Sequence, residues 1–279
     1  MKTVITMTSW TKRINFVAQA IFRFFKTQTV KPDIFYLWLA EAEFPNKEKD
    51  LPEDLLLICQ AFNVQIRWTK DNEYCFKRWY VYPTHYEDLV ISIDDDITYD
   101  PNLIKIVQET AKKETHAVIH YLGRGGLIHI VDSIGYMPSQ QYVYKDVRNY
   151  IMCQCAFLPK SFPLESFSAE NIQIRKKICP KCDESWLHPF LIKDNIPIVR
   201  LNTYSSENSL MQDVAIRNGL HFDLVTINGK KYKRADLYKY VVLKTFPDLA
   251  SAWKRAFPNY NLNYFGNMTV DDILKVIGK

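Results

Sequence analysis

Three consecutive aspartates, Asp94, Asp95 and Asp96, directly follow an apolar run over residues 89–93. The run is short and rich in β-branched residues, which is typical of a buried strand. Neighbouring carboxylates repel one another unless a cation or a ligand rich in hydrogen-bond donors neutralises them. Carboxylate oxygens suit hard divalent cations such as Mg²⁺ or Mn²⁺. The triplet therefore predicts a cation or ligand site at the end of a strand, and a solvated acidic turn is the alternative.

Four cysteines form two close pairs, Cys153 with Cys155 and Cys179 with Cys182. Four thiolates can hold a zinc ion tetrahedrally. The single residue between Cys153 and Cys155 is not the usual spacing of a zinc-binding pair, so we favour reduced or buried thiols over a zinc site.

Strand and helix patterns alternate along the first half of the chain. Apolar runs predict strands at residues 4–8, 34–39, 64–68, 89–93 and 117–121, and helical spacing predicts helices at residues 15–26, 51–61, 75–82 and 101–113. This alternation predicts an α/β fold whose mostly parallel sheet is covered by helices on both faces. Ligands of such sheets bind outside the carboxyl ends of the strands, which is where the aspartate triplet falls.

The sequence changes character from about residue 205. Residues 235–257 carry apolar residues at helical spacing and are interrupted by Pro247, which predicts two helices. We therefore divide the chain into a main α/β domain, residues 1–204, and a small C-terminal helical appendage, residues 205–279.

Composition narrows the class of protein. The chain has 279 residues and a formal net charge of +5, which favours phosphates or an anionic membrane but is too small to indicate nucleic-acid binding. It contains no apolar stretch of the roughly 18 residues that a membrane span needs. The N-terminal residues lack the features of a secretory signal, so we expect a cytoplasmic protein. All 8 glycines lie at or after Gly123, so the first half contains no glycine-rich dinucleotide or phosphate loop.

Several motifs match one protein family in the same order along the chain. They are Thr8–Ile14, Pro32–Leu39, Glu43–Asn46, Asp94–Asp96 and Cys182–Trp186. With these motifs, residues 3–200 resemble bacterial glycosyltransferases of the GT-A fold, in particular those of capsule and lipopolysaccharide assembly. The resemblance implies a GT-A catalytic domain over residues 1–204 that moves a sugar from a nucleotide-diphosphate donor, a UDP-sugar, to a glycan or lipid-linked acceptor. The appendage would then lie on the acceptor or membrane side.

The resemblance implies a role for each aspartate of the triplet. Asp96 would be the principal ligand of Mn²⁺ or Mg²⁺, Asp94 would face the ribose or share the metal, and Asp95 would lie at the sugar. The metal would neutralise the departing nucleoside diphosphate. Asp71, at the end of the third predicted strand, would receive the base or the ribose.

The resemblance also implies nucleotide contacts from residues upstream of the triplet. Thr8, Ser9 and Arg13 would line the nucleotide, because hydroxyls can bind uracil or ribose and an arginine can grip phosphate through two hydrogen bonds. For Arg13 the alternative is a solvated residue at a helix start. Lys77 would reach the diphosphate, but a surface charge pair formed with Arg78 explains these two residues nearly as well.

A second acidic pair, Asp183 and Glu184, lies 87 residues beyond Asp96 (183 minus 96). An inverting glycosyltransferase needs a carboxylate that takes the proton of the acceptor hydroxyl. The family pattern is Asp-Asp-x-Trp, whereas this chain has a glutamate at the second position, and we weight Glu184 slightly over Asp183 as the base. His188 would share the helical face of Glu184 and could contact metal or phosphate, although a structural histidine is the favoured alternative.

Three classes of function stay open. An inverting glycosyltransferase of surface-polysaccharide synthesis is favoured, and a retaining enzyme could use the same metal motif. The lack of early glycines argues against a sugar-1-phosphate nucleotidyltransferase. The second acidic pair argues against a non-catalytic carbohydrate-binding protein.

A basic and aromatic cluster consists of Lys230, Lys231, Lys233 and Arg234 around Tyr232. It could make a peripheral contact with an anionic membrane, where a lipid-linked acceptor would be found. A solvated helix start is the alternative.

Overall fold

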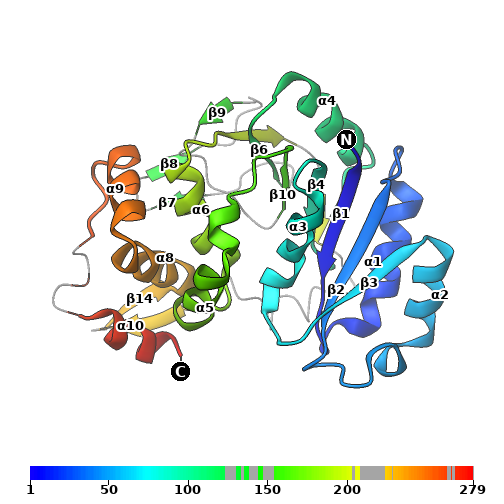
Figure 1. The fold of residues 1–279 in the computed structure, drawn as a ribbon, viewed down its shortest axis with the longest axis horizontal. Helices are drawn as coiled ribbons and strands as arrows, with labels where there is room; N and C mark the ends of the chain where they lie inside the picture. Colours follow the sequence, from blue (N-terminus) through cyan, green and yellow to red (C-terminus); the bar gives the residue numbers. More distant parts are fainter. Residues whose placement is uncertain are drawn as a thin grey trace.

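An eight-stranded mixed sheet forms the centre of the computed structural model (Figure 1). The structure describes residues 1–122, 130–132, 135–137, 144–146, 154–202, 205–207, 224–227, 229–262, 265 and 268–278. The strand order is β3-β2-β1-β4-β10-β6-β11-β9. These strands are β1 (Thr3–Thr8), β2 (Ile34–Ala40), β3 (Val64–Thr69), β4 (Leu89–Ile93), β6 (Val118–Leu122), β9 (Tyr144–Asp146), β10 (Cys155–Phe157) and β11 (Ile198–Asn202).

The sheet is mostly parallel, as the sequence predicts. Strands β1 to β4 run in one direction, and β6 and β11 run parallel to each other. Strand β10 lies antiparallel between β4 and β6, which gives β6 the same direction as β4. The edge strand β9 is also antiparallel to its neighbour β11. The carboxyl ends of β1, β4, β6 and β11 therefore lie along the same edge of the sheet.

Helices cover both faces of the sheet. On one face, α1 (Ile14–Thr27), α2 (Glu53–Ala61) and α4 (Leu103–Lys113) pack against strand residues such as Ile5, Leu37 and Ile91. On the other face, a second hydrophobic cluster joins the strands to η2 (Tyr74–Val81), α5 (Ala169–Ile178), α6 (Asp183–Lys193), α8 (Arg234–Thr245), α9 (Pro247–Ala256) and α10 (Val270–Ile277). Within the described ranges, no helix has both the length and the apolar character needed to cross a membrane.

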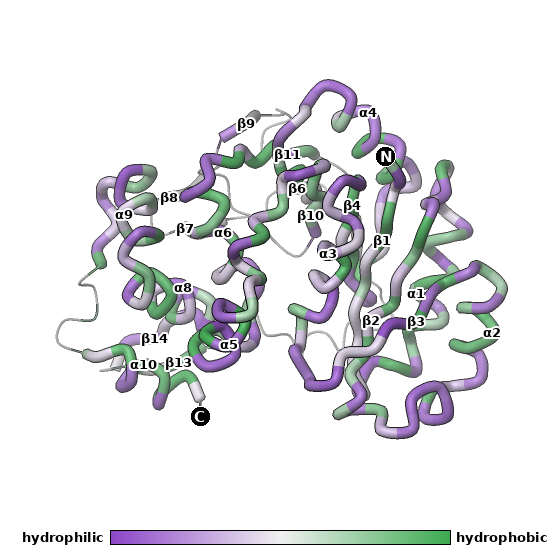
Figure 2. The backbone as a smooth tube through the Cα atoms, in the orientation of Figure 1, coloured by the Kyte–Doolittle hydropathy of each residue, from purple (hydrophilic) through white to green (hydrophobic). Residues whose placement is uncertain are grey.

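The sequence of α1 explains why this helix lies on the sheet. Val17, Ile21 and Phe24 recur every three or four residues and are all buried, whereas Lys26 is exposed. In Figure 2, α1 accordingly alternates between hydrophobic and hydrophilic stretches. Burial of this apolar stripe, rather than capping, stabilises the helix, because its N-cap residue Arg13 makes no side-chain capping bond.

Of the C-terminal helices, α8 and α9 pack onto α6, and α10 packs onto α8. Leu237 of α8, Trp253 of α9 and Ile273 of α10 share one hydrophobic cluster with Trp186 of α6. The two helices predicted within residues 235–257 are confirmed as α8 and α9. The division of the chain at residue 204 stays a prediction.

Some elements differ from the sequence prediction. The helix predicted over residues 75–82 is the 3₁₀-helix η2, followed by the short α3 (Tyr82–His85) with a proline in its first turn. The basic residues Lys230–Lys233 form strand β14, paired with β13 (Leu224–Ile227), so the helix begins only at Arg234. Elements not predicted include β10 and the ribbon of β5 (Ile97–Tyr99) with β12 (Ser205–Glu207).

Candidate active site

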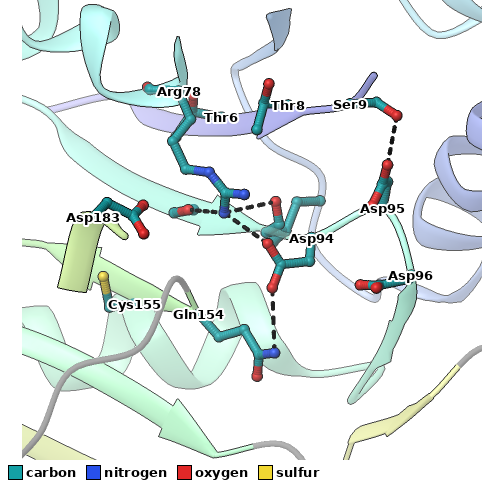
Figure 3. A network of polar contacts seen from close by, with 12 residues as sticks. Thr6, Thr8, Ser9, Arg78, Asp94, Asp95, Asp96, Gln154, Cys155 and Asp183 are labelled. Atoms are coloured by element: carbon teal, nitrogen blue, oxygen red, sulfur yellow. Dashed lines mark hydrogen bonds and ion pairs between the residues drawn. The ribbon is translucent and has the colours of Figure 1, made fainter. Parts of the chain in front are cut away.

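The aspartate triplet lies where β4 leaves the sheet, beside the end of β1. Met7 of β1 is paired with Ile93 of β4, so the segments that follow these two strands are neighbours. The first segment carries Ser9 and Arg13, and the second carries the triplet. Figure 3 shows Ser9 and the three aspartates close together, with Arg78 reaching Asp94 from η2.

Asp95 and Asp96 are both held by residues that follow β1. The Ser9 hydroxyl donates to Asp95 Oδ2 at 2.6 Å, and Arg13 Nη2 lies 3.0 Å from Asp95 Oδ1. Arg13 Nη1 donates to Asp96 Oδ2 at 2.6 Å. Burial raises the pKa of Asp96 to about 6, and the charge of Asp95 adds to this shift. Ser9 and Arg13 therefore lie in the predicted site, where they contact the acidic motif directly.

Asp94 has a different partner from its two neighbours. Arg78 Nη1 donates to Asp94 Oδ1 at 2.8 Å and to the Ser92 hydroxyl at 3.0 Å. Gln154 Nε2 lies 3.4 Å from Asp94 Oδ2 (Figure 3). The backbone N–H of Asp94 donates to the Tyr99 hydroxyl at 2.7 Å. Asp94 is thus tied to the sheet. Its side chain is 16% exposed and that of Asp96 is 20% exposed, whereas the Asp95 side chain is fully buried.

Lys77 is a buried residue, with 1% of its surface exposed. Its ammonium group donates to the backbone carbonyl of Ser9 at 3.0 Å and to Glu43 Oε2 at 3.1 Å. Burial lowers the pKa of Lys77, while the Glu43 carboxylate opposes this shift. The interpretation of Lys77 and Arg78 as a surface charge pair is wrong, because both side chains turn inward from η2 and hold the two loops of the site.

Two other predicted nucleotide contacts are bonded to residues outside the triplet. The Thr8 hydroxyl donates to the Trp38 carbonyl at 2.9 Å, which ties β1 to β2. Asp71 is exposed, and Lys176 of α5 lies 2.9 Å from its Oδ2. The hydrogen bond from Lys176 lowers the pKa of Asp71. The assignment of Thr8 and Asp71 to the nucleotide stays a prediction.

The second acidic pair opens helix α6 and reaches the same arginine as the triplet. Asp183 is buried and accepts a hydrogen bond from Trp79 Nε1 at 2.7 Å. Burial raises the pKa of Asp183 to about 7, Glu184 adds to the shift, and the charge of Arg78 opposes it. Glu184 accepts a bond from the Cys182 thiol at 3.2 Å. Figure 3 shows Asp183 near the Arg78 side chain.

The predicted metal contacts outside the triplet are buried in the core. The His188 ring packs edge-on against Trp253, with ring centroids 5.1 Å apart. Cys155, Cys179 and Cys182 are buried free thiols, and Cys153 lies outside the described residues. Within the described part of the chain, no group of three or more histidine, cysteine, aspartate or glutamate side chains is arranged to hold a metal ion.

Several residues of the site were not predicted. Trp79 donates a hydrogen bond to Asp183, and the Tyr99 hydroxyl accepts one from the Asp94 backbone. Gln154, which directly precedes β10, approaches Asp94. Trp79 directly follows Lys77 and Arg78, so the sequence already placed it beside two residues that were considered for the site. The proximity of Gln154 depends on the long-range pairing of β10, for which the local sequence gives no signal.

Comparison with known proteins separates sequence likeness from likeness of fold. No family model matches the sequence, and no curated protein matches it. Among solved structures, residues 1–349 of TarS from S. aureus align with a TM-score of 0.51 and 11% identity, covering 99% of this chain and 70% of that one. The complex of the same protein with UDP gives a TM-score of 0.50 and 12% identity, covering 98% of this chain and 70% of that one.

The chain has the GT-A fold. This confirms the fold that the motifs implied. In this fold, Arg78 binds Asp94 of the triplet and lies near Asp183 of the second acidic pair.

Proposed function

We propose that this GT-A protein is a glycosyltransferase that moves a sugar from a UDP-sugar to a glycan or lipid-linked acceptor in surface-polysaccharide synthesis. The observation that carries the proposal is the position of Arg78 between two acidic motifs. Its guanidinium binds Asp94 at 2.8 Å and also influences the pKa of Asp183. Sugar transfer needs a site for the leaving diphosphate and a base for the acceptor, and the two motifs can supply these two functions.

The proposed donor is a UDP-sugar, supported by the UDP complex of TarS, which has a similar fold. Ser9 and Arg13 border the triplet and carry the donor groups that a nucleotide diphosphate would bind. Arg13 is bound to two carboxylates, so a diphosphate would share or take over its guanidinium.

The proposed cofactor is Mn²⁺ or Mg²⁺, and the oxygen ligands of the triplet fit such an ion. These ions use one or two carboxylates and complete their shell with water and phosphate oxygens, so they do not need three protein ligands. Asp96, the ligand that the family resemblance implies, and Asp94 are the two candidates, because their side chains are partly exposed whereas that of Asp95 is fully buried. When bound, the ion would neutralise charge on the diphosphate.

The proposed mechanism is a single displacement with inversion. The acceptor hydroxyl oxygen bonds to the anomeric carbon while its proton passes to the Asp183 carboxylate. The bond between that carbon and the phosphate oxygen breaks, and its electron pair leaves with UDP. A pKa of about 7 suits Asp183 to this role at neutral pH. Glu184 binds the Cys182 thiol and influences His120 instead, which favours Asp183 over the residue that the sequence weighted.

A panel of nucleotide sugars with Mn²⁺ tests the proposed reaction through the release of UDP. We expect one donor to give release that an acceptor increases and that Asp96→Ala abolishes. Formation of pyrophosphate from UTP and a sugar 1-phosphate would indicate a nucleotidyltransferase instead. Binding without turnover would indicate a carbohydrate-binding protein. The anomeric configuration of the product, determined by NMR, separates inversion from retention.

The β13–β14 hairpin is the proposed contact with an anionic membrane. Leu224, Thr226, Lys231 and Lys233 lie on its exposed face, opposite the buried Val225. Basic side chains beside an exposed leucine suit a surface of anionic lipid. We expect salt-sensitive binding to phosphatidylserine vesicles that is lost in Lys231→Glu/Lys233→Glu. The matched control is Lys112→Glu/Lys113→Glu on the exposed end of α4, and no binding by the native chain at low salt would contradict the proposal.

A further inference from the structure

A row of polar side chains crosses one face of the sheet near the carboxyl ends of β4, β6 and β11. Residues that pair directly across neighbouring strands point to the same face. Cys155 pairs with His120, and His120 pairs with Arg200. Ser92 continues the row on β4, since its neighbour Ile91 pairs with Ala156.

The previous row on the same face is entirely apolar. It consists of Val90, Phe157, Val118 and Ile198, which belong to the hydrophobic cluster that α6 covers. The change from apolar to polar residues therefore takes place within one pleat of the sheet, at the edge where α/β proteins bind ligands.

In the described part of the structure, the two ring nitrogens of His120 and the Nη2 atom of Arg200 are buried without hydrogen-bond partners. His120 is 0% exposed, and neither ring nitrogen has a hydrogen-bond partner in the described part of the structure. Arg200 is 6% exposed, and within the same residues its buried Nη2 also lacks an acceptor. Burying such groups without hydrogen bonds costs free energy, and native proteins rarely leave them unpaired. A bound group with acceptor oxygens would satisfy Arg200 Nη2 and the ring nitrogen of His120 that carries the proton.

The charges around His120 favour an anion. Burial lowers its pKa to about 3, so the imidazole is neutral at physiological pH and has one N–H to donate. The charge of Arg200 lowers this pKa further and exceeds the opposing effect of Glu184. The local field at His120 is therefore positive on balance, although a carboxylate lies nearby.

We propose that His120 and Arg200 form an anion subsite that binds a phosphate or carboxylate group of the acceptor. This inference rests on the proposed function, because it takes Asp183 as the base that receives the proton of the acceptor hydroxyl. Two strand spacings separate β4 from β6, which corresponds to about 10 Å. The subsite on β6 and β11 is therefore set apart from the aspartate triplet at the end of β4, where the donor diphosphate is proposed to bind.

The donor diphosphate is the other source of such an anion, so the experiment uses two probes. The first probe is methyl phosphate, monitored by the ¹H–¹³C resonances of the histidine rings in the full chain. The His120 signal is assigned by its loss in His120→Gln. The second probe is UDP with Mn²⁺, measured by calorimetry. Arg200→Met is the test variant, and Arg255→Met, on the exposed end of α9, is the matched control.

We expect methyl phosphate to shift the His120 resonance in the native chain and in Arg255→Met, with at least a tenfold weaker response in Arg200→Met. UDP affinity should stay within twofold in both variants. An unchanged response in Arg200→Met, or no response in the native chain, would overturn the subsite. A tenfold loss of UDP affinity in Arg200→Met would assign the arginine to the donor instead and would also overturn it.

One further outcome separates the subsite from the proposed function on which it rests. If the native chain binds methyl phosphate at His120 but does not bind UDP, the subsite stands and the proposed function fails.

If Arg200→Met does not fold, as judged by its thermal transition, Arg200→Lys replaces it. Lysine keeps the charge but loses the guanidinium geometry, so methyl phosphate should then bind more weakly while still shifting the His120 signal. An unchanged affinity in Arg200→Lys would overturn the role of the arginine.

Discussion

The two halves of the sheet edge differ in whether their polar side chains have partners. At the ends of β1 and β4, each aspartate of the triplet has a cationic or hydroxyl partner within 3.0 Å. At the ends of β6 and β11, in the described residues, His120 and the Nη2 atom of Arg200 have no such partner. Where the side chains are already paired, the network is rigid before a ligand binds, and the ligand must replace existing hydrogen bonds. Where the side chains are unpaired, the ligand supplies the missing hydrogen bonds.

The largest effect is expected from the proposed base, which lies between the two halves. Asp183→Asn keeps the shape and the bond from Trp79 but cannot take a proton. We expect the transfer rate to fall about 10²–10⁴-fold, with UDP affinity within twofold of the native value by calorimetry. Asp194→Asn, at the exposed end of the same helix, is the control. A greater loss in Glu184→Gln than in Asp183→Asn would return the role of the base to Glu184.

The stability of the folded chain should depend strongly on Arg78, which binds Asp94 at the end of β4. Arg78→Met leaves the partly buried Asp94 without its cation. Breaking a fully buried pair in this way costs about 3–5 kcal/mol, so we expect a loss of up to about 3 kcal/mol here. Urea unfolding followed by tryptophan fluorescence measures the loss. Arg67→Met, on the exposed side of β3, should change the free energy of unfolding by less than about 0.5 kcal/mol. Equal effects of the two substitutions would show that the pair does not hold the site together.

Stability should also respond to pH through the buried carboxylates. In the folded chain the pKa is about 7 for Asp183 and about 6 for Asp96, above the ordinary value of 3.8 in both cases. The folded state therefore binds protons that the unfolded state has released, and the free energy of unfolding should fall as pH rises from about 4 to about 7. A pKa difference of one corresponds to about 1.4 kcal/mol. Asp183→Asn should make this dependence shallower in urea titrations, and an unchanged slope would contradict the raised pKa.

The smallest effect is expected at Asp71, which lies away from both halves of the edge. Its carboxylate is exposed and paired with Lys176. We expect Asp71→Asn to leave UDP affinity within twofold in calorimetry, since solvent screens such pairs. A tenfold loss would support the nucleotide role that the family resemblance implied.

The sequence was sufficient for the parts of the fold that depend on local pattern. Strands β1 to β4 and helices α1, α2 and α4 follow from runs and spacings that are complete within a few residues. The aspartate triplet was predicted for the same reason, because its residue type and its place after a strand are both local. The short strand β10, with three residues, has no such pattern, and its place between β4 and β6 depends on pairing with distant strands.

The site residues show the same limit. Sequence patterns treated Lys77 and Arg78 as equivalent cations, yet one binds Glu43 and the Ser9 carbonyl and the other binds Asp94. The difference between Asp94 and Asp96 likewise depends on which arginine reaches each of them. The polar pairing of His120 with Arg200 became visible only with the register of β6 and β11.

The late position of β10 in the chain has a consequence for synthesis on the ribosome. Strand β4 is fully buried in the finished sheet, and its second neighbour is β10. The chain from Ile93 to Phe157 spans 64 positions (157 minus 93), which take about 3–13 s to synthesise at 5–20 residues per second. During this time the nascent sheet presents an apolar, unpaired edge that can pair with other chains. We therefore expect this protein to depend on chaperones during synthesis and to aggregate more when translation pauses before residue 157.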